Sequence, residues 1–138
     1  MSQKLCRQAY EGRLGTWAAA RSPALRVRYE NVPFTPATGE TYLHATQLPA
    51  DTESDDLAGA HRAYRGVFQV SVYAPINTGS GAAAAIADEL AALFVHNARL
   101  TSGAITVQQT TPASVAPALQ FESYYAVPVS LTYRADTT

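Results

Sequence analysis

Disulfides, long apolar runs and an excess of charge of one sign are all missing from this chain. Its single cysteine, Cys6, excludes an internal disulfide and a zinc site built from cysteines. No apolar run approaches the ~18 residues of a membrane span, and the opening MSQKLCRQAYEGRL holds no apolar signal core. Ten basic and eleven acidic residues give a formal net charge of -1, so no overall field attracts nucleic acid. These absences predict a soluble, cytoplasmic domain.

What the chain does contain is enough apolar material for one hydrophobic core. Of its 138 residues, 47% are hydrophobic and 15% are charged, which argues against disorder. The length predicts a single domain spanning residues 1–138. Eight Tyr and one Trp stand against four Phe, and such a bias is typical of protein–protein interfaces.

The apolar pattern predicts two helices and five strands. Residues 2–20 and 82–97 have helical spacing, whereas residues 65–74 alternate between apolar and polar side chains, as a half-buried strand does. The other expected strands are residues 25–30, 41–48, 104–110 and 121–133. This order predicts an α+β fold, a mostly antiparallel β-sheet with two α-helices packed on one face.

Two single residues indicate details of local backbone structure. Pro128 removes an N–H donor from the last strand, so we expect that strand to be an edge strand or bulged there. Ser80 precedes the second helical segment, and we expect it to be the N-cap residue.

The sequence shows no constellation of catalytic or metal-binding residues. His44, His61 and His96 lie in three separate segments, none at the spacing of a metal-ligand pair. The turn Gly79-Ser80-Gly81 lacks the flanking pattern of a nucleophile elbow and the Lys-Ser/Thr pair of a phosphate-binding loop. We therefore expect a protein that is not an enzyme and has no cofactor or metal site.

Charged residues instead offer candidates for an interface. Arginine side chains on or before two strands suit bidentate contacts with phosphates or carboxylates. The near-neutral balance favours carboxylates, and residues 49–60 form an acidic loop that we expect to be exposed and mobile until a partner orders it. The interface candidates are Arg26, Arg28, Arg62, Arg65, Asp51, Asp55 and Asp56.

Several phrases of the sequence resemble a known family. A core from Arg62 to Arg134 contains HRAYRGVFQVSVYAPINTGSG, an Ala-rich helix ending in ELAALF, and the terminal FESYYAVPVSLTYRA. Near the start, RLGTWAAARSPALRVRYENVPFTP fits the family's helix, first strand and Pro-rich loop. In these stretches the chain resembles the tail terminators of long-tailed bacteriophages, the tail-completion group similar to minor tail protein U.

The resemblance implies a structural protein of the virion tail, assembled in the host cytoplasm. Members of this family form a six-fold ring that caps the tail tube, ends polymerisation of the tail tube protein and provides the surface that joins the head-completion protein. DNA passes through the lumen of the ring without sequence-specific binding. A ring needs a heterologous interface, which arginine faces and an acidic loop would supply.

Two alternatives stay open at this point. One is another head–tail connector or neck protein, because these are also small, β-rich and ring-forming. The other is a small α+β enzyme or ligand-binding domain, with His61 and Arg62 beside Asp55 and Asp56 as its polar centre.

Overall fold

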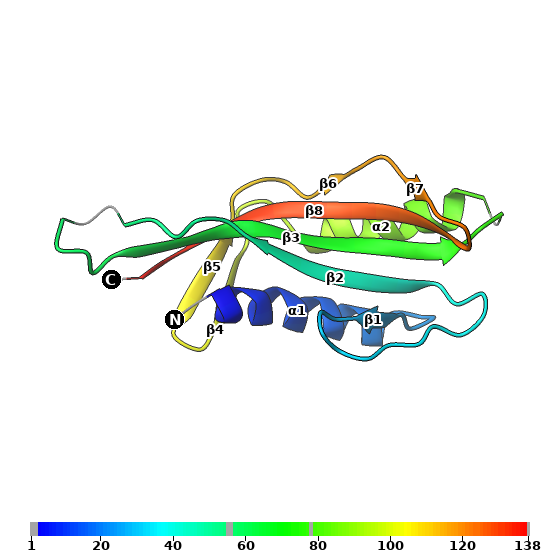
Figure 1. The fold of residues 1–138 in the computed structure, drawn as a ribbon, viewed down its shortest axis with the longest axis horizontal. Helices are drawn as coiled ribbons and strands as arrows, with labels where there is room; N and C mark the ends of the chain where they lie inside the picture. Colours follow the sequence, from blue (N-terminus) through cyan, green and yellow to red (C-terminus); the bar gives the residue numbers. More distant parts are fainter. Residues whose placement is uncertain (1–2, 55–56, 78, 138) are drawn as a thin grey trace.

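Two long antiparallel strands lie at the centre of the sheet and extend along most of the molecule (Figure 1). The structure is a computed structural model that describes residues 3–54, 57–77 and 79–137, so the interface candidates Asp55 and Asp56 lie outside the described residues. β3 (Arg62–Pro75) and β8 (Tyr124–Thr137) pair in one unbroken register, from Arg62 opposite Thr137 to Pro75 opposite Tyr124. Strands this long, alternating in polarity, bury one face and leave the other to the surface.

The remaining strands extend this pair into an eight-stranded sheet. Its order is β1-β2-β3-β8-β5-β4, and β6 and β7 also pair with β8. Among the described pairs β1–β2 alone is parallel, so the sheet is mixed and mostly antiparallel. The bounds are β1 (Arg26–Arg28), β2 (Tyr42–Pro49), β4 (Arg99–Ser102), β5 (Ile105–Gln109), β6 (Ser114–Val115) and β7 (Leu119–Gln120).

Both helices, α1 (Gln3–Ala20) and α2 (Gly81–Leu93), cover the same face of the sheet. The ring of Tyr10 from α1 stacks on Phe68 of β3 with centroids 5.3 Å apart, and Phe94 at the end of α2 packs edge-on against the same Phe68 at 6.0 Å. Val70 and Val72 of β3 continue this buried row, as the alternation predicts. The predicted α+β fold, with two helices on one face of a mostly antiparallel sheet, is confirmed.

The second helix is shorter than its apolar pattern predicts. α2 ends at Leu93, and Asn97 lies beyond it with a φ of 68°, in the left-handed region that Asn tolerates. The chain then enters β4, which we did not predict, and returns through Gly103 (φ 59°) into β5. Ser80 does stand at the N-cap position, but its side chain makes no capping hydrogen bond.

The sheet order places β8 between β3 and β5, so β8 as a whole is not the expected edge strand, and its register with β3 shows no bulge at Pro128. The Pro128 carbonyl accepts a hydrogen bond from Ala116 N at 2.9 Å, on the side of β8 that faces away from β3. In a strand the N and C=O of one residue point to the same side, so the missing N–H also faces away from β3. There it meets the gap between β6 and β7, where no ladder partner is required.

Candidate assembly surfaces

The side of β2, β3 and β8 that carries Tyr42, Tyr73 and Ala126 is covered by no helix, and we call it the helix-free face. These three residues are register partners, so their side chains point to one side. Neither guanidinium nor carboxylate occurs among the register positions between its two ends; the side chains there are His44, Thr46, Gln69, Ser71, Pro128 and Ser130. These three strands carry no charge between their ends, although Arg28 of the neighbouring β1 lies opposite His44.

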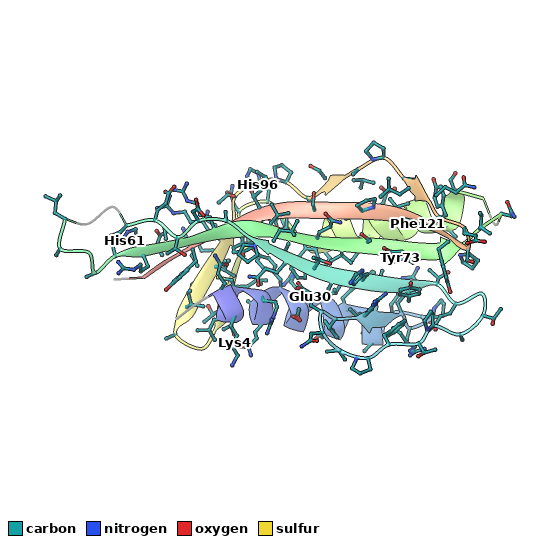
Figure 2. All side chains as sticks on the ribbon, viewed as in Figure 1. Lys4, Glu30, His61, Tyr73, His96 and Phe121 are labelled. Carbon is teal, nitrogen blue, oxygen red and sulfur yellow. The ribbon has the colours of Figure 1, made fainter. Side chains whose placement is uncertain are left out.

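A row of aromatic rings crosses the helix-free face at one end of the molecule. Phe34 packs on Tyr42 with centroids 5.0 Å apart, Tyr42 stacks on Tyr73 at 5.1 Å, and Tyr73 stacks on Phe121 at 6.2 Å. The ring of Tyr124 contacts both Tyr42 and Tyr73 edge-on. Figure 2 shows Tyr73 and Phe121 together at the end of the molecule opposite His61.

Phe121 belongs to a tight hairpin turn between β7 and β8. Leu119 and Gln120 pair with Ala126 and Tyr125, and Phe121 N donates to Tyr124 O at 2.7 Å across the turn. Phe121, with 48% of its surface exposed, Glu122 and Ser123 are all exposed on this turn. The sequence predicts a strand that begins at residue 121, but the backbone reverses direction over residues 121–123 and the strand begins at Tyr124.

A pocket of about 420 Å³ lies at the other end of the helix-free face. Its floor contains Val67 and Thr132, which are register partners, and Gly66 beside them. Two arginines, Arg65 and Arg134, are also register partners and flank this floor. The pocket thus combines an apolar floor with two guanidinium groups.

Both arginines of this pocket already hold a carboxylate. Arg65 Nη2 lies 3.2 Å from Glu53 Oε2, and the fork of Arg134 binds Asp136 with its Nε and Nη2 each 2.9 Å from a carboxylate oxygen. The hydrogen bond from Arg134, and to a lesser degree that from His61, lowers the pKa of Asp136. The buried Nε of Arg65 has no hydrogen-bond partner among the described residues.

The structure separates the two predicted arginine pairs. Arg26 and Arg28 lie on β1 opposite Tyr42 and His44, whereas Arg65 lies near the other end of β2, whose last residue, Pro49, pairs with Gly66. At ~3.3 Å per residue the length of β2 is roughly 25 Å. One phosphate or one carboxylate therefore does not bridge both pairs.

Within its own chain Arg26 organises the loop of residues 31–41. Its Nη1 lies 2.9 Å from Glu40 Oε1, and its guanidinium carbon stands 4.4 Å above the ring of Phe34. Arg28 is exposed, and its guanidinium opposes the rise that burial causes in the pKa of Tyr42. The loop is thus ordered by the chain itself: Arg26 is exposed but paired with Glu40, and Arg28 is exposed beside it.

The remaining interface candidates lie at the far end of the molecule. Arg62 donates hydrogen bonds to the carbonyls of Gly59 and His61, and Asp51 is exposed. Glu53 and Ala63 exchange two backbone hydrogen bonds of 3.1 and 2.8 Å, so part of the acidic segment that we expected to be mobile is paired with β3.

The three histidines lie in three separate places, and the alternative polar centre of His61 and Arg62 with Asp55 and Asp56 extends outside the described residues. His44 lies on the helix-free face, where burial and then Arg28 lower its pKa, His61 pairs with Asp136 at 2.9 Å, and His96 is exposed beyond α2. Across residues 3–54, 57–77 and 79–137 no group of three potential metal ligands occurs. No helix of that part of the chain is long and apolar enough to cross a membrane.

Sequence reasoning missed the hairpin turn and the pocket. One signal for the turn was present: Glu122 is the single charged residue between Leu100 and Tyr133, and it follows a large aromatic residue. The pocket gave no such signal, because it depends on the register of β3 with β8, and a shift by one residue moves every side chain to the other face.

Known proteins share this fold and part of the sequence. The family model described as "Phage tail terminator protein" matches residues 5–133. A solved structure of a protein whose name states no function is 46% identical, with 100% of this chain and 98% of that chain covered and a TM-score of 0.85. A chain from the "Virion of native gene transfer agent (GTA) particle" is 19% identical, with 99% and 100% covered and a TM-score of 0.69, which shows a shared fold. No curated protein matches the chain.

Proposed function

The chain belongs to the phage tail terminator family and is a structural protein of the phage tail, and on this premise we propose that it forms the ring that caps the tail tube. The match over residues 5–133 carries the proposal, because it covers nearly the whole chain. In the proposed function six copies close into a ring, end polymerisation of the tail tube protein and offer a surface to the head-completion protein. DNA passes through the lumen without sequence-specific contacts.

The surfaces of the molecule support this assignment. A cyclic ring of more than two copies requires two different patches on each copy, one meeting the other on its neighbour. The aromatic end and the arginine pocket are two such different patches on one face. The location that follows is the virion tail, reached from the host cytoplasm, and the related chain in a gene transfer agent virion is consistent with it.

The interface candidates of the sequence keep a place in this proposal. Arg28 and Asp51 are exposed and suit contacts with a neighbouring copy or with the tube end. Arg26, Arg62 and Arg65 hold acceptors of their own chain, so each would have to exchange or share a partner on assembly. Asp55 and Asp56 are the remaining two interface candidates of the sequence, and they keep the same proposed role.

The test combines the purified protein with purified tail tubes. We expect six-fold rings, or added density at one tube end only, in negative-stain images, together with a molar mass near six times that of the monomer by light scattering. Tubes that continue to grow in the presence of the protein would contradict the proposal. Binding to isolated heads instead of to tubes would identify another neck component.

A further inference from the structure

The hairpin turn between β7 and β8 presents a preorganised pair of side chains. Phe121 is held by its stack on Tyr73 and by the hydrogen bond from its own N to Tyr124 O, yet nearly half of its surface is exposed. Glu122 beside it is the single carboxylate between Glu89 and Asp136. A rigid aromatic side chain next to a charged one is a combination that interfaces favour, since little conformational entropy is lost on docking.

The pocket at the other end of the helix-free face has the complementary properties. Val67 and Thr132 form an apolar floor, and the guanidiniums of Arg65 and Arg134 flank it. Among the residues that the structure describes, the ion pair of Arg65 with Glu53 uses Nη2, and a guanidinium has five N–H donors. An additional carboxylate therefore fits the donors that the pocket carries.

The two features do not meet within one molecule. The turn precedes Tyr124, the first residue of β8, and the pocket lies at Thr132 and Arg134 near its last residues. At ~3.4 Å per residue this separation is roughly 30 Å. A contact between the turn and the pocket must therefore join two molecules, and each copy carries both features.

We propose that the β7–β8 turn of one copy docks into the arginine pocket of the next, with Phe121 on the floor of Val67 and Thr132 and Glu122 between Arg65 and Arg134. This inference rests on the proposed ring, whose subunit contact it specifies. A contact between two different patches is heterologous, and it closes into the proposed ring of six where the rotation from each copy to the next is one sixth of a turn. A second copy is the occupant because its turn brings one further carboxylate, Glu122, to the N–H donors of Arg65 that the contact with Glu53 leaves over.

Cross-linking tests the contact directly. Ser123→Cys in the turn and Ala50→Cys at the pocket rim leave Phe121, Glu122 and both arginines unchanged, and the natural Cys6 is fully buried. We expect a mixture of the two variants, treated with a short bis-maleimide in the presence of tail tubes, to give a covalent dimer. Ser123→Cys mixed with Ala85→Cys, an exposed site on α2, is the matched control. Equal dimer yields in the two mixtures overturn the contact.

Charge exchange gives a second, independent readout. Glu122→Arg alone and Arg65→Glu alone each place like charges across the contact, and we expect each to lower the yield of rings about tenfold. When the two variants alternate around a ring, each contact again joins one positive and one negative side chain. A ring with an even number of subunits, such as six, permits this alternation. Asp88→Arg and Arg99→Glu are exposed controls with the same charge changes, and thermal melting verifies that each variant folds.

The outcomes separate this inference from the proposed function. If the wild-type chain caps tubes but neither the cross-link nor the rescue by mixing occurs, the function stands and this contact is wrong. If the cross-link forms and tubes still grow, the contact is correct and the capping function is wrong.

Discussion

Gly66 and Tyr133 meet at a point in the sheet where no larger side chain fits. Tyr133 Oη donates to Gln3 Oε1 at 2.6 Å and accepts from Gln47 Nε2 at 2.8 Å, which ties the first turn of α1 to β2 and β8. A Cβ on Gly66 would stand 2.5 Å from Tyr133 Oη and 2.8 Å from the carbonyl of Leu48. This glycine is needed for space, and the network around Tyr133 depends on it.

Gly66→Ala is therefore expected to destabilise the fold by about 2 kcal/mol, because Tyr133 must move and its two hydrogen bonds weaken. Gly12→Ala is the matched control, since nothing lies within 4 Å of a Cβ at this exposed helical position. We expect Gly12→Ala to stabilise the protein by up to about 1 kcal/mol. Urea unfolding measures both, and equal midpoints for the two variants would refute the steric argument.

Three ionisable side chains in the core make the fold sensitive to alkali. Burial raises the pKa of Cys6 to about 11 and that of Tyr133 to about 12, and burial followed by the proximity of Cys6 and Tyr133 raises the pKa of Tyr10. The unfolded chain releases these protons near pH 9 and 10, whereas the folded chain retains them. The stabilisation is thus complete below about pH 9 and is lost as the pH rises toward the folded values.

Tyr10→Phe tests this alkaline loss of stability. The Tyr10 hydroxyl is buried and has no hydrogen-bond partner among the described residues, so its removal is expected to leave stability at pH 7 unchanged or slightly higher. Between pH 10 and 12 the free energy of unfolding should then fall less steeply, by up to about 1.4 kcal/mol per pH unit. The measurement is urea unfolding at several alkaline pH values. Identical slopes for variant and wild type would show that Tyr10 does not cause the effect.

At the scale of elements, the short strand β1 and the loop after it form one unit held by Arg26. The guanidinium binds Glu40 and covers Phe34, while Glu40 Oε1 also accepts from Ala37 N at 2.9 Å. Glu40 N in turn donates to Ala37 O at 3.0 Å. The loop consequently has protected amides although it contains two prolines and lies on the surface.

Arg26→Ala should raise the hydrogen-exchange rates of the Ala37 and Glu40 amides by about fivefold to tenfold, because one exposed ion pair and one cation–π contact are lost. Arg28→Ala removes the same charge from the same strand without touching Glu40, and it should leave these two rates unchanged. Amide exchange followed by mass spectrometry distinguishes the variants. Similar rates in both would mean that the ion pair does not hold the loop.

Elements with strong periodicity could be predicted from the sequence. The alternation of Phe68, Val70 and Val72 identified β3, and the spacing of Ile86, Leu90 and Phe94 identified α2, because both patterns record a face that must be buried. The two-residue strands β6 and β7 could not be predicted in this way. They exist because Pro128 interrupts the outer edge of β8, a condition set by strand order and not by local pattern.

For the candidate surfaces, too, local residue types could be predicted from the sequence, whereas their arrangement in space could not. The residue types of an interface were visible in the sequence, since Tyr and Arg are enriched. Which of them lie together was not visible, because Arg65 meets Arg134, 69 positions away, only through the register of β3 with β8. Conversely, Arg26 and Arg62 seemed equivalent in the sequence and lie at opposite ends of β2.

At the scale of the whole molecule, the chain is an elongated sheet with different chemistry at its two ends. Tyr73 and Phe121 lie at one end and His61 at the other (Figure 2). The aromatic end also carries the Arg26–Glu40 ion pair over Phe34, and the arginine pocket belongs to the end of His61. A contact between unlike ends of successive copies is heterologous, and it forms a ring where the rotation between copies closes. Assembly is thus expected to depend on the ends and to be insensitive to the outer surface of α2.

Phe121→Ser tests this dependence with little effect on folding. The side chain is 48% exposed, so its removal costs the folded monomer mainly the stack on Tyr73, about 1 kcal/mol. Val95→Ser is the matched control, because Val95 is 55% exposed beyond α2 and far from the aromatic row. Light scattering in the presence of tube ends should show loss of rings for Phe121→Ser and retention for Val95→Ser. If both variants assemble like wild type, the aromatic end is not a subunit contact; if Val95→Ser alone fails, the interface lies on the helical side.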